Sequence, residues 1–472
     1  MQATQLVWLR NDLRLDDHPA LALAAEQGAL QVVFCAVPGQ WQQHHLSLAR
    51  LGLLAAVLQD LANRLANLGI AFHLLDAEYF SDVPAQLLQL CLQENITDIW
   101  FQAETPLDEQ RRDQAVHKVL SNANINVHLL AEDLLVALPI NTQQGEPYKV
   151  FTPYYHRWLL LLEDLQQPPY AEPKPQARAI KPSVLKCTWA GKFRKDLWPG
   201  NEQHALKRLI TFCEHKLDTY PVQRDFPNLP ATSTLSPYLA NGQLGPRRLL
   251  TTIQRAYATT DRNWRNDDWL RELAWRDFYR QLLLYFPQLS KGRAFKKETD
   301  DLVWRNDPTA FNAWCEGKTG FPIVDAAMRQ LNQTGWMHNR LRMITASFLS
   351  KLLFLDWRRG EQYFLETLID SEFAANNGGW QWSASTGVDA APYFRVFNPT
   401  LQSKRYDPQG LFIKRFVPEL KTVIAKQIHN PSAELRQQCG YPQPIVDYQH
   451  ARKEAIAAFK SLPKSQGANQ FR

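Results

Sequence analysis

The sequence lacks the features that mark several common classes of protein. No two of its 20 glycines are spaced as Gly-x-Gly, so the glycine-rich fingerprint of nicotinamide-dependent enzymes is absent. No segment approaches the roughly 18 consecutive apolar residues of a membrane-spanning helix, and the N-terminus has no signal-peptide pattern. The six cysteines are scattered, without a CxxC pair or the spacing of a zinc site. We therefore expect a soluble, cytoplasmic protein with reduced cysteines and no metal.

The chain otherwise has the composition of a globular protein, with an uneven distribution of charge. Its 472 residues are 45% hydrophobic and 21% charged, and at roughly 100 to 200 residues per domain the length predicts two to four domains. Residues 1–130 contain 7 Lys and Arg against 14 Asp and Glu, whereas the remainder contains 46 against 33. The acidic and the basic part are expected to have different partners.

Residues 1–130 alternate strand-like and helical segments. The strand-like segments are QLVWLR, LQVVFCAV, AFHLL, DIWFQ and NVHLL, and residues 47–68 and 82–93 are typical of helices. This βαβ pattern predicts a five-stranded parallel sheet in a Rossmann-like α/β domain. Ligands of such domains bind outside the carboxyl ends of the strands.

The rest of the chain is predicted to be a connection followed by an all-α domain. The segment QQPPYAEPKPQARAIKP, at residues 166–182, contains five prolines and indicates a linker. Beyond residue 200 the strand signals largely vanish, and helices are predicted at residues 202–217, 268–285, 323–333, 339–353 and 361–370. The expected domains are thus 1–130, 131–199 and 200–472.

Tryptophan is concentrated in the predicted helical domain, where nine of the 15 fall between residues 264 and 382. A large aromatic core would explain any single one of them. Their density also suits two other uses. Indole is easily oxidised, so a spaced series can pass an electron, and its flat ring can stack on a flipped nucleobase.

Three polar stretches stand out in the same domain. ATSTLS, at residues 231–236, places hydroxyl groups where they would cap a helix start or sit beside a bound phosphate. DSEFAANNGGWQW (370–382) and TGWMHNRLRM (334–343) mix acids, amides and arginines with indoles. Because an apolar core does not tolerate such groups unpaired, these two stretches predict a ligand cavity.

These stretches lie within a longer similarity. GKTGFPIVDAAMRQLNQTGWMHNRLRMITASFL, DWRRGEQYF, LIDSEFAANNGGWQWSASTG and DAAPYFRVFNPT resemble the flavin domain of the photolyase and cryptochrome family, most closely its bacterial class I members that repair cyclobutane pyrimidine dimers. LVWLRNDLRLDDHPAL, EPYKVFTPYYHRW and ELAWRDFYR extend the resemblance over nearly the whole chain. It implies an α/β antenna domain, an all-α FAD-binding catalytic domain and light-driven DNA repair. A cryptochrome-like blue-light photoreceptor is the alternative, although the chain ends at KSLPKSQGANQFR without a long regulatory tail.

The resemblance implies which residues hold FAD, the cofactor that would act as FADH⁻. They are Tyr220, Thr232, Ser233, Thr234, Leu235, Ser236, Glu272, Asn339, Asp370, Glu372 and Asn376. Several relatives have Arg where Thr234 stands, so this position does not supply the charged phosphate contact. Asn376 matches the position beside flavin N5, where a neutral amide can hydrogen-bond the reduced ring without supplying a proton. Plant cryptochromes carry Asp there, and many animal ones carry Cys.

The resemblance also assigns the catalytic electron-transfer chain and the lesion pocket. Trp380, Trp357 and Trp304 match a chain that runs from flavin to surface in that order. Trp275 and Trp382 match the two indoles that sandwich the flipped dimer, while Glu272 would hydrogen-bond a damaged base. The other contacts to substrate or DNA are Arg224, Asn339, Arg340, Met343 and Gln402. Relatives that repair 6-4 photoproducts have His at positions 339 and 343, and neither is present here.

A light-harvesting antenna and a DNA partner complete the expectation. His44, Asp108, Glu109 and Lys291 match contacts of a 5,10-methenyltetrahydrofolate antenna, although Asn often stands in place of Asp108. A deazaflavin antenna is the alternative, and an acidic helix start would explain Asp108 and Glu109 without any ligand. The implied partner is UV-damaged DNA containing cyclobutane pyrimidine dimers, which the basic part of the chain would bind. We expect a monomer with no obligate protein partner and no membrane association.

Overall fold

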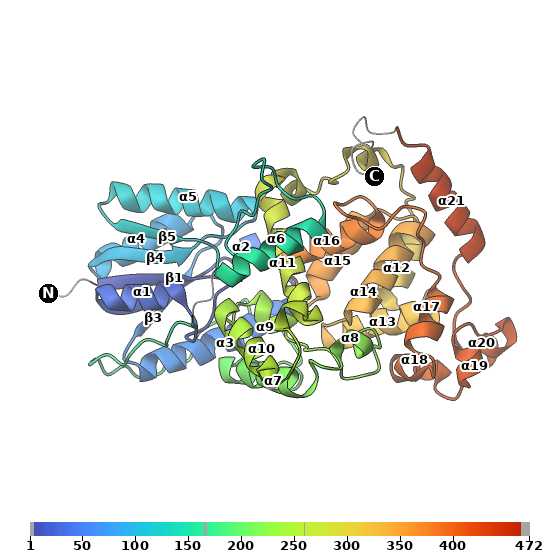
Figure 1. Ribbon diagram of the computed structural model, residues 1–472, viewed down its shortest axis with the longest axis horizontal. Coiled ribbons are helices and arrows are strands. Elements are labelled where there is room, and N and C mark those ends of the chain that lie inside the picture. Colours follow the sequence, from blue (N-terminus) through green and yellow to red (C-terminus); the bar gives the residue numbers. More distant parts are fainter. Residues whose placement is uncertain (1–3, 165–167, 259, 464–472) are drawn as a thin grey trace. The chain divides into compact units, whose positions relative to one another are not determined.

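The computed structural model describes residues 4–164, 168–258 and 260–463 (Figure 1). It contains two compact units. Unit 1 comprises residues 1–218, 233–287 and 369–372, and unit 2 comprises residues 219–232, 288–368 and 373–472. The borders at residues 130 and 199 expected from the sequence concern functional domains and remain a prediction.

Unit 1 contains the predicted five-stranded parallel sheet. Its strand order is β3–β2–β1–β4–β5, with β1 (Thr4–Leu9), β2 (Ala29–Ala36), β3 (Ala71–Asp76), β4 (Ile96–Gln102) and β5 (Asn126–Leu130). The central strands β1 and β2 pair in a register that aligns Val7 with Val32, and both side chains are fully buried. The predicted α/β fold is therefore confirmed.

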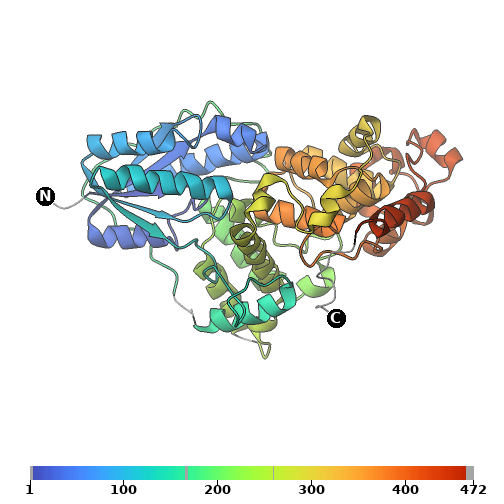
Figure 2. The same cartoon turned by 90° about the horizontal axis from the view of Figure 1, so that it is seen from above.

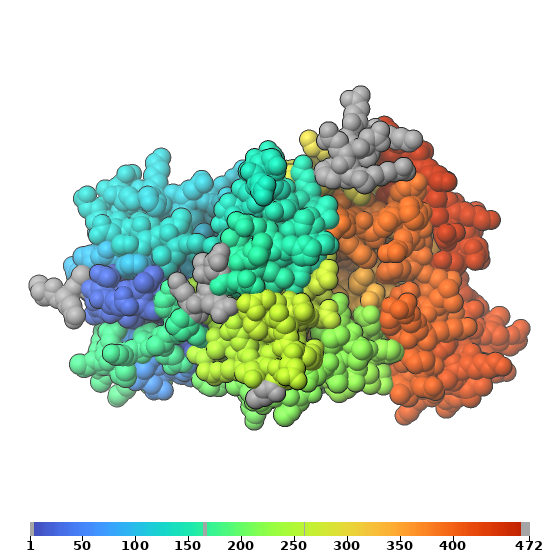
Figure 3. Space-filling model, viewed as in Figure 1, coloured from blue at the N-terminus to red at the C-terminus, as the bar shows by residue number. Residues whose placement is uncertain are grey.

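The helices between these strands cover the sheet (Figures 1 and 2). They are α1 (Pro19–Gln27), α2 (Pro38–Gln43), α3 (Leu48–Asn67), α4 (Val83–Gln93) and α5 (Leu107–Asn122). From the central strand β1, the chain adds β2 and then β3 on one side of the sheet. It then adds β4 and β5 on the other side of β1. Because parallel crossovers are right-handed, α4 and α5, which pack on each other, cover the face opposite α1 and α3. The flank of α5 is visible in cyan in Figure 3.

The remaining elements of unit 1 are helices. They are α6 (Phe151–Asp164), α7 (Glu202–His215), α9 (Ser236–Ala240), α10 (Pro246–Tyr257), the 3-10 turn η1 (Trp264–Asn266) and α11 (Asp268–Tyr285). The observed bounds of α11 are those predicted, because Asp267 caps its first turn by accepting a hydrogen bond from the backbone N–H of Leu270 at 2.7 Å. Helix α7 packs on α10, and α6 packs on α11. The predicted linker has no helix or strand at residues 168–182, and its first two residues lie outside the described ranges.

The named elements of unit 2 are all helices or helical turns within its described residues. Its α-helices are α8 (Tyr220–Gln223), α12 (Pro308–Glu316), α13 (Pro322–Thr334), α14 (Asn339–Ser347), α15 (Trp357–Thr367), α16 (Phe373–Ala384), α17 (Pro399–Tyr406), α18 (Leu411–Phe416), α19 (Ala425–Ile428), α20 (Ala433–Cys439) and α21 (Tyr448–Lys460). Short 3-10 turns are η2 (Pro287–Lys291), η3 (Lys297–Asp301) and η5 (Pro418–Leu420), and η4 (Phe348–Leu352) is a π-helical turn. Helices α12, α13, α14, α15, α16 and α18 share one large apolar core. The all-α fold predicted for the FAD-binding part is confirmed.

In unit 2, one predicted helix changes its geometry and another starts earlier than predicted. The helix predicted at residues 339–353 changes to π-helical geometry at Phe348, where periodicity alone shows no break. The helix predicted to start at residue 361 begins at Trp357, because the side chain of Asp356 accepts a hydrogen bond from the backbone N–H of Arg358 at 3.0 Å and caps it.

Two further expectations concern cysteine and membranes. All six cysteines are free, as expected. Within the described ranges, no helix has both the length and the apolarity to cross a bilayer.

Candidate functional site

Helix α11 presents three charged residues from unit 1 on one face. Glu272, Arg276 and Arg280 follow one another at four-residue intervals, which places them on one side of a helix. The Nε atoms of Arg276 and Arg280 donate to Glu372 at 3.1 and 2.7 Å, and Arg280 also pairs with Glu132. Burial alone would raise the pKa of Glu372, but these two guanidinium groups lower it to about 2. Glu372 is therefore a fixed negative charge.

The arginine pair was not singled out from the sequence, although its four-residue spacing on a predicted helix was a usable signal. The neighbouring Asp370 is buried, and Glu272 is half-buried on α11. The predicted residues Glu272, Asp370 and Glu372 thus all lie in unit 1.

The hydroxyl segment has an irregular backbone rather than a capped helix. Thr234 has φ of +52°, in the left-handed region that a β-branched residue rarely adopts. The residue before α9 is Leu235, and no side chain caps this helix, so the expected N-cap role of the hydroxyls was wrong. The hydroxyl of Thr234 instead donates to the carbonyl of Ser233 at 2.7 Å. Ser233 and Ser236 are half-buried and Leu235 is buried.

Trp275 has one face covered by another aromatic ring. Its indole is parallel to Phe151 of α6 at a centroid distance of 3.7 Å and an interplanar angle of 8°. Phe278 meets Trp275 edge-on at 5.7 Å. Trp275 remains half-buried, so at most one face of the indole is left for a ligand.

Unit 2 holds a chain of three amides around Glu361, of which Asn377 and Gln381 are buried and Asn376 is half-buried. Nδ2 of Asn376 donates to the backbone carbonyl of Glu361 at 3.0 Å, and Nδ2 of Asn377 donates to Oε1 of the same residue at 2.8 Å. Nε2 of Gln381 donates to Oδ1 of Asn377 at 2.9 Å. Burial raises the pKa of Glu361 to about 7, against the opposing effect of Asn377. With its amide N–H directed to Glu361, Asn376 has its carbonyl oxygen left as an acceptor.

The three tryptophans of the predicted chain differ in burial. Trp380 and Trp357 belong to the core of unit 2, whereas Trp304 is half-buried and packs against Phe354 and Phe459. The indole N–H groups of all three have no hydrogen-bond partner among the described residues. An indole can hold a transient charge because its two fused rings delocalise that charge.

The predicted substrate residues of unit 2 lie on several helices. Asn339, Arg340 and Met343 share the first turns of α14, where Arg340 donates to the carboxylate of Asp225 at 2.8 and 3.2 Å. That ion pair was not foreseen, and it neutralises one predicted DNA contact. The guanidinium of Arg224 lies 5.4 Å from the ring of Tyr220.

Four other predicted residues of unit 2 lie outside α14. Trp382 is half-buried on α16, Gln402 is half-buried on α17, and Thr232 is half-buried at the edge of the hydroxyl segment. Oε1 of Gln402 is a buried acceptor with no partner among the described residues. Lys291 ends η2 and is exposed.

Three of the predicted antenna residues come together in unit 1. Nε2 of His44 lies 3.4 Å from Oδ2 of Asp108, and its Nδ1 lies 3.8 Å from Oε1 of Glu109. Asp108 and Glu109 occupy the first turn of α5, where the helix dipole favours negative charge. Burial, followed by the nearby Glu104, raises the pKa of Glu109 to about 7. The ring of Phe80 meets His44 edge-on at 5.6 Å.

A buried ion-pair cluster lies where the strand order reverses, at the ends of β1 and β4. Nη1 of Arg10 donates to Asp113 at 3.1 Å, and Nη2 of Arg112 donates to Glu104 at 2.6 Å. Both guanidinium groups lie over the indole of Trp8, at 4.4 and 4.9 Å. In sheets of this kind the reversal point is the usual position for a ligand, and here charged side chains fill it.

Comparisons with known proteins agree with this geometry. Residues 5–175 match the family model "DNA photolyase", and residues 269–461 match "FAD binding domain of DNA photolyase". Among curated relatives, the "Deoxyribodipyrimidine photo-lyase" of Escherichia coli (strain K12) is 42% identical over 98% of this chain and 99% of its own. The protein of the same name from Vibrio cholerae is 41% identical, over 97% and 99%.

Solved structures show the same architecture. A class III photolyase from Agrobacterium tumefaciens superposes with a TM-score of 0.87 at 33% identity, covering 98% of both chains. A photolyase from Sulfolobus tokodaii that contains two FAD molecules gives a TM-score of 0.81 at 31% identity, over 97% of this chain and 100% of that one. A cryptochrome from Synechocystis gives a TM-score of 0.83 at 29% identity, over 97% and 99%.

Proposed function

The chain belongs to the DNA photolyase family, and from this premise we propose that it is a deoxyribodipyrimidine photo-lyase, an enzyme that uses light to split cyclobutane pyrimidine dimers in UV-damaged DNA. The observation that carries the proposal is the near full-length similarity to curated enzymes of that name, at 35–42% identity. When bound in its two-electron-reduced form, FAD would supply the light-driven electron that splits the dimer, and the electron would return to it, so that no net redox change results.

The residues present fit FAD. The fixed charge of Glu372, held by Arg276 and Arg280, gives carboxylate oxygens that can accept hydrogen bonds from sugar-alcohol hydroxyls. The hydroxyls of Ser233 and Ser236 lie in an irregular segment that suits a diphosphate. We propose that the full FAD set consists of Tyr220, Thr232, Ser233, Thr234, Leu235, Ser236, Glu272, Asn339, Asp370, Glu372 and Asn376.

We propose that Asn376 keeps the flavin in its reduced, repair-competent form. Its Nδ2 donates to the carbonyl of Glu361, so its Oδ1 would be the atom that accepts a hydrogen bond from a bound flavin. An acceptor amide can take a hydrogen bond from the N5–H of a reduced isoalloxazine but has no acidic proton to give. A carboxylic acid at the same place would supply one. This neutral side chain favours the photo-lyase over the cryptochrome-like photoreceptor.

The lesion would be held by aromatic and acidic side chains. A dimer inside the duplex is out of reach, so the enzyme must flip it out of the helix. We propose that Trp275 and Trp382 stack on it, that Glu272 donates or accepts a hydrogen bond at a base, and that Arg224, Asn339, Arg340, Met343 and Gln402 contact the lesion or the strand. The excess of Lys and Arg after residue 130 supports binding to phosphates, which should weaken with salt.

We propose that Trp380, Trp357 and Trp304 carry electrons to oxidised flavin. The order is supported by burial, since the first two indoles lie in the core and Trp304 reaches the surface. The chain serves only to regenerate the reduced cofactor. It is not part of the repair cycle itself.

We propose that the antenna is 5,10-methenyltetrahydrofolate rather than a deazaflavin. His44, Asp108 and Glu109 form a polar cluster beside Phe80, which suits the amide-like edge and flat ring of a pterin, with Lys291 as a further contact. At the strand reversal, where such sheets usually bind ligands, the ion pairs of Arg10 and Arg112 fill the space instead. Purified protein should therefore take up the folate, and Glu109→Ala should release it without loss of FAD. Uptake of a deazaflavin in preference to the folate would contradict this assignment.

The setting of the reaction is proposed on similar grounds. We propose a cytoplasmic protein, since six free cysteines suit a reducing compartment. We also propose that it acts as a monomer without a protein partner.

The central experiment is repair itself. Reduced protein, illuminated with an oligonucleotide that contains one thymine dimer, should restore two thymines, and the same mixture kept in the dark should not. A preparation that contains flavin and binds the oligonucleotide but leaves the dimer intact under light would favour the photoreceptor. A colourless protein that takes up no FAD would reject both photochemical functions.

A further inference from the structure

Arg208 of α7 is held beside the hydroxyl segment by neutral groups. Its Nη1 donates to the carbonyl oxygen of Thr234 at 3.3 Å and to Oγ1 of the same residue at 3.1 Å. Its Nη2 donates to the carbonyl of Leu197 at 3.2 Å. The rings of Trp198 and Tyr238 lie 5.4 and 5.5 Å from the guanidinium carbon. The side chain is therefore fixed in orientation.

The charge of this arginine is not neutralised within the described part of the chain. None of its hydrogen bonds goes to a carboxylate, and its Nε–H group has no partner in these contacts. Other arginines of unit 1 behave differently: Arg248 pairs with Asp16 at 2.6 Å, and Arg276 pairs with Glu372 at 3.1 Å. A half-buried, oriented guanidinium without a counter-ion is suited to a phosphate, which accepts its parallel N–H donors.

The backbone that Arg208 contacts also has a conformation typical of anion sites. Thr234 is left-handed, and Leu235 follows with φ of −93° and ψ of −7°. Successive residues of opposite hand turn their N–H groups toward a common point, a geometry that binds anions. The guanidinium donates to both oxygen atoms of Thr234, so it stabilises this strained residue and adds its charge at the same place.

We propose that Arg208 binds the diphosphate of FAD and supplies, from α7, the positive charge that relatives with Arg at position 234 supply from the segment itself. The inference rests on the proposed function, because it takes FAD as the ligand. It also explains why Thr is tolerated at position 234. The short side chain leaves room for the guanidinium, and its hydroxyl serves as one of the acceptors that orient it.

The test is the affinity of apoprotein for FAD, followed by quenching of flavin fluorescence. Arg208→Gln should weaken binding about 10- to 100-fold, the effect of losing a charge-assisted contact. Arg208→Lys should keep part of the affinity. The double variant Arg208→Gln with Thr234→Arg should recover most of it, because the charge returns to the same place from the other side.

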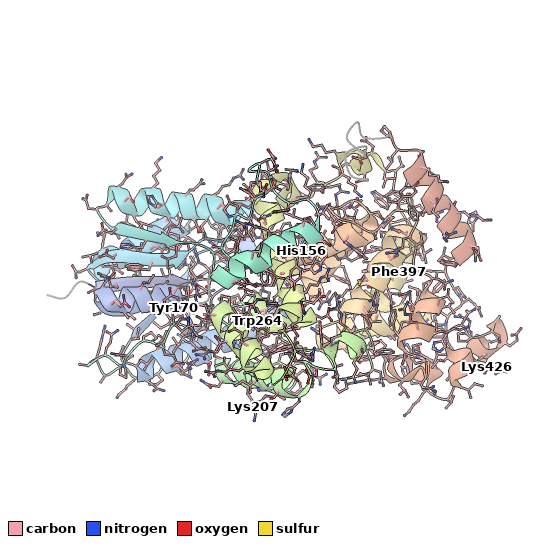
Figure 4. All side chains as sticks on the ribbon, viewed as in Figure 1. His156, Tyr170, Lys207, Trp264, Phe397 and Lys426 are labelled. Atoms are coloured by element: carbon pink, nitrogen blue, oxygen red, sulfur yellow. The ribbon has the colours of Figure 1, made fainter. Side chains whose placement is uncertain are left out.

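Lys207 provides the matched control. It is the neighbouring residue on α7, it is exposed, and Figure 4 shows it at the outer edge of that helix. Lys207→Gln changes the net charge equally and should leave FAD affinity unchanged. The salt dependence of FAD binding should also become shallower in Arg208→Gln but not in Lys207→Gln.

Several outcomes would overturn the proposal. Equal FAD affinity in Arg208→Gln and the parent would reject it. A purely structural role would lower the melting temperature of the Arg208→Gln apoprotein, and the double variant would then fail to recover FAD affinity. A parent chain that binds no FAD would instead reject the proposed function itself, so the two failures are distinguishable.

Discussion

Gly360 of α15 packs closely against the six-membered ring of Trp380 on α16. A Cβ atom at Gly360 would overlap the six-membered ring of that indole and would lie 2.6 Å from Cδ2 of Leu349. The helix thus carries a glycine in its interior, where it costs helix stability, because the proposed innermost tryptophan needs the space. The glycine in α15 therefore helps to set the position of Trp380.

Gly360→Ala should therefore destabilise the apoprotein by about 1 to 3 kcal/mol, since overpacking forces Trp380 or Leu349 to move. Photoreduction of bound flavin should slow as well. Denaturant unfolding measures the first effect and flash photolysis the second. Gly379→Ala is the control, because a Cβ there meets nothing within 4 Å, and a helical alanine should leave stability unchanged or raise it. Equal destabilisation by both substitutions would contradict the packing argument.

Trp304→Phe should block photoreduction of oxidised flavin and leave repair by chemically reduced enzyme unchanged. The reason is that the proposed chain loses its outermost donor, while the electron for repair comes from flavin already reduced. Photoreduction is measured as the yield of reduced flavin under light. Repair is measured anaerobically with an oligonucleotide that contains a dimer. Trp264→Phe, a half-buried indole of unit 1 labelled in Figure 4, should affect neither. Photoreduction at the parent rate would remove Trp304 from the chain.

Trp275→Ala should weaken binding of dimer-containing DNA by about 1 to 3 kcal/mol, the contribution of one base stacked on an aromatic ring. Binding of undamaged DNA should change little, because phosphate contacts dominate it. Trp275→Phe should keep most of the affinity. Since the indole also packs on Phe151, flavin content of each variant should be measured alongside the binding curves. Loss of affinity for both DNAs to the same extent would indicate a folding defect and not a stacking role.

Glu361→Gln should change how stability depends on pH. The pKa of the folded carboxyl is raised from 4.5 to about 7 by burial. Between these two pH values the folded protein binds more protons than the unfolded chain, so the free energy of unfolding falls as pH rises from about 4.5 to about 7. The fall attributable to this group is on the order of 1 to 3 kcal/mol.

The Gln variant keeps a side-chain acceptor for Asn377 and cannot ionise, so it should lack that part of the fall. Denaturant unfolding at a series of pH values measures it. Glu366→Gln, on the exposed side of the same helix, is the control and should follow the parent curve. If the free energy of unfolding of Glu361→Gln depended on pH as that of the parent does, burial would not raise the pKa of the Glu361 carboxyl.

The elements could be predicted where the pattern of apolar residues is regular. The five strands and α11 were foreseen because each has a clear periodicity and, in α11, a capping Asp267 at its start. Elements whose boundaries depend on caps or on helix geometry were not foreseen. The start of α15 at Trp357 and the π-turn at Phe348 are of this kind.

Side-chain partners across elements were also beyond the sequence. The pairing of Arg340 with Asp225, and of Arg276 and Arg280 with Glu372, joins residues about 90 to 115 positions apart. No local sequence pattern predicts such pairs. The proposed roles of Asn376 and the three tryptophans rest on motif resemblance, to which the structure adds burial and hydrogen bonding.

Local residue order alone determined that an α/β part precedes an all-α part, because strand and helix periodicities are properties of neighbouring residues. The sequence motifs of the chain also determined its family. Only the tertiary structure decided that Arg208 stands beside Thr234, that the strand reversal is filled by ion pairs and that Glu361 is buried with a raised pKa. These properties depend on desolvation and on distances between side chains remote in sequence, and only folding sets those quantities.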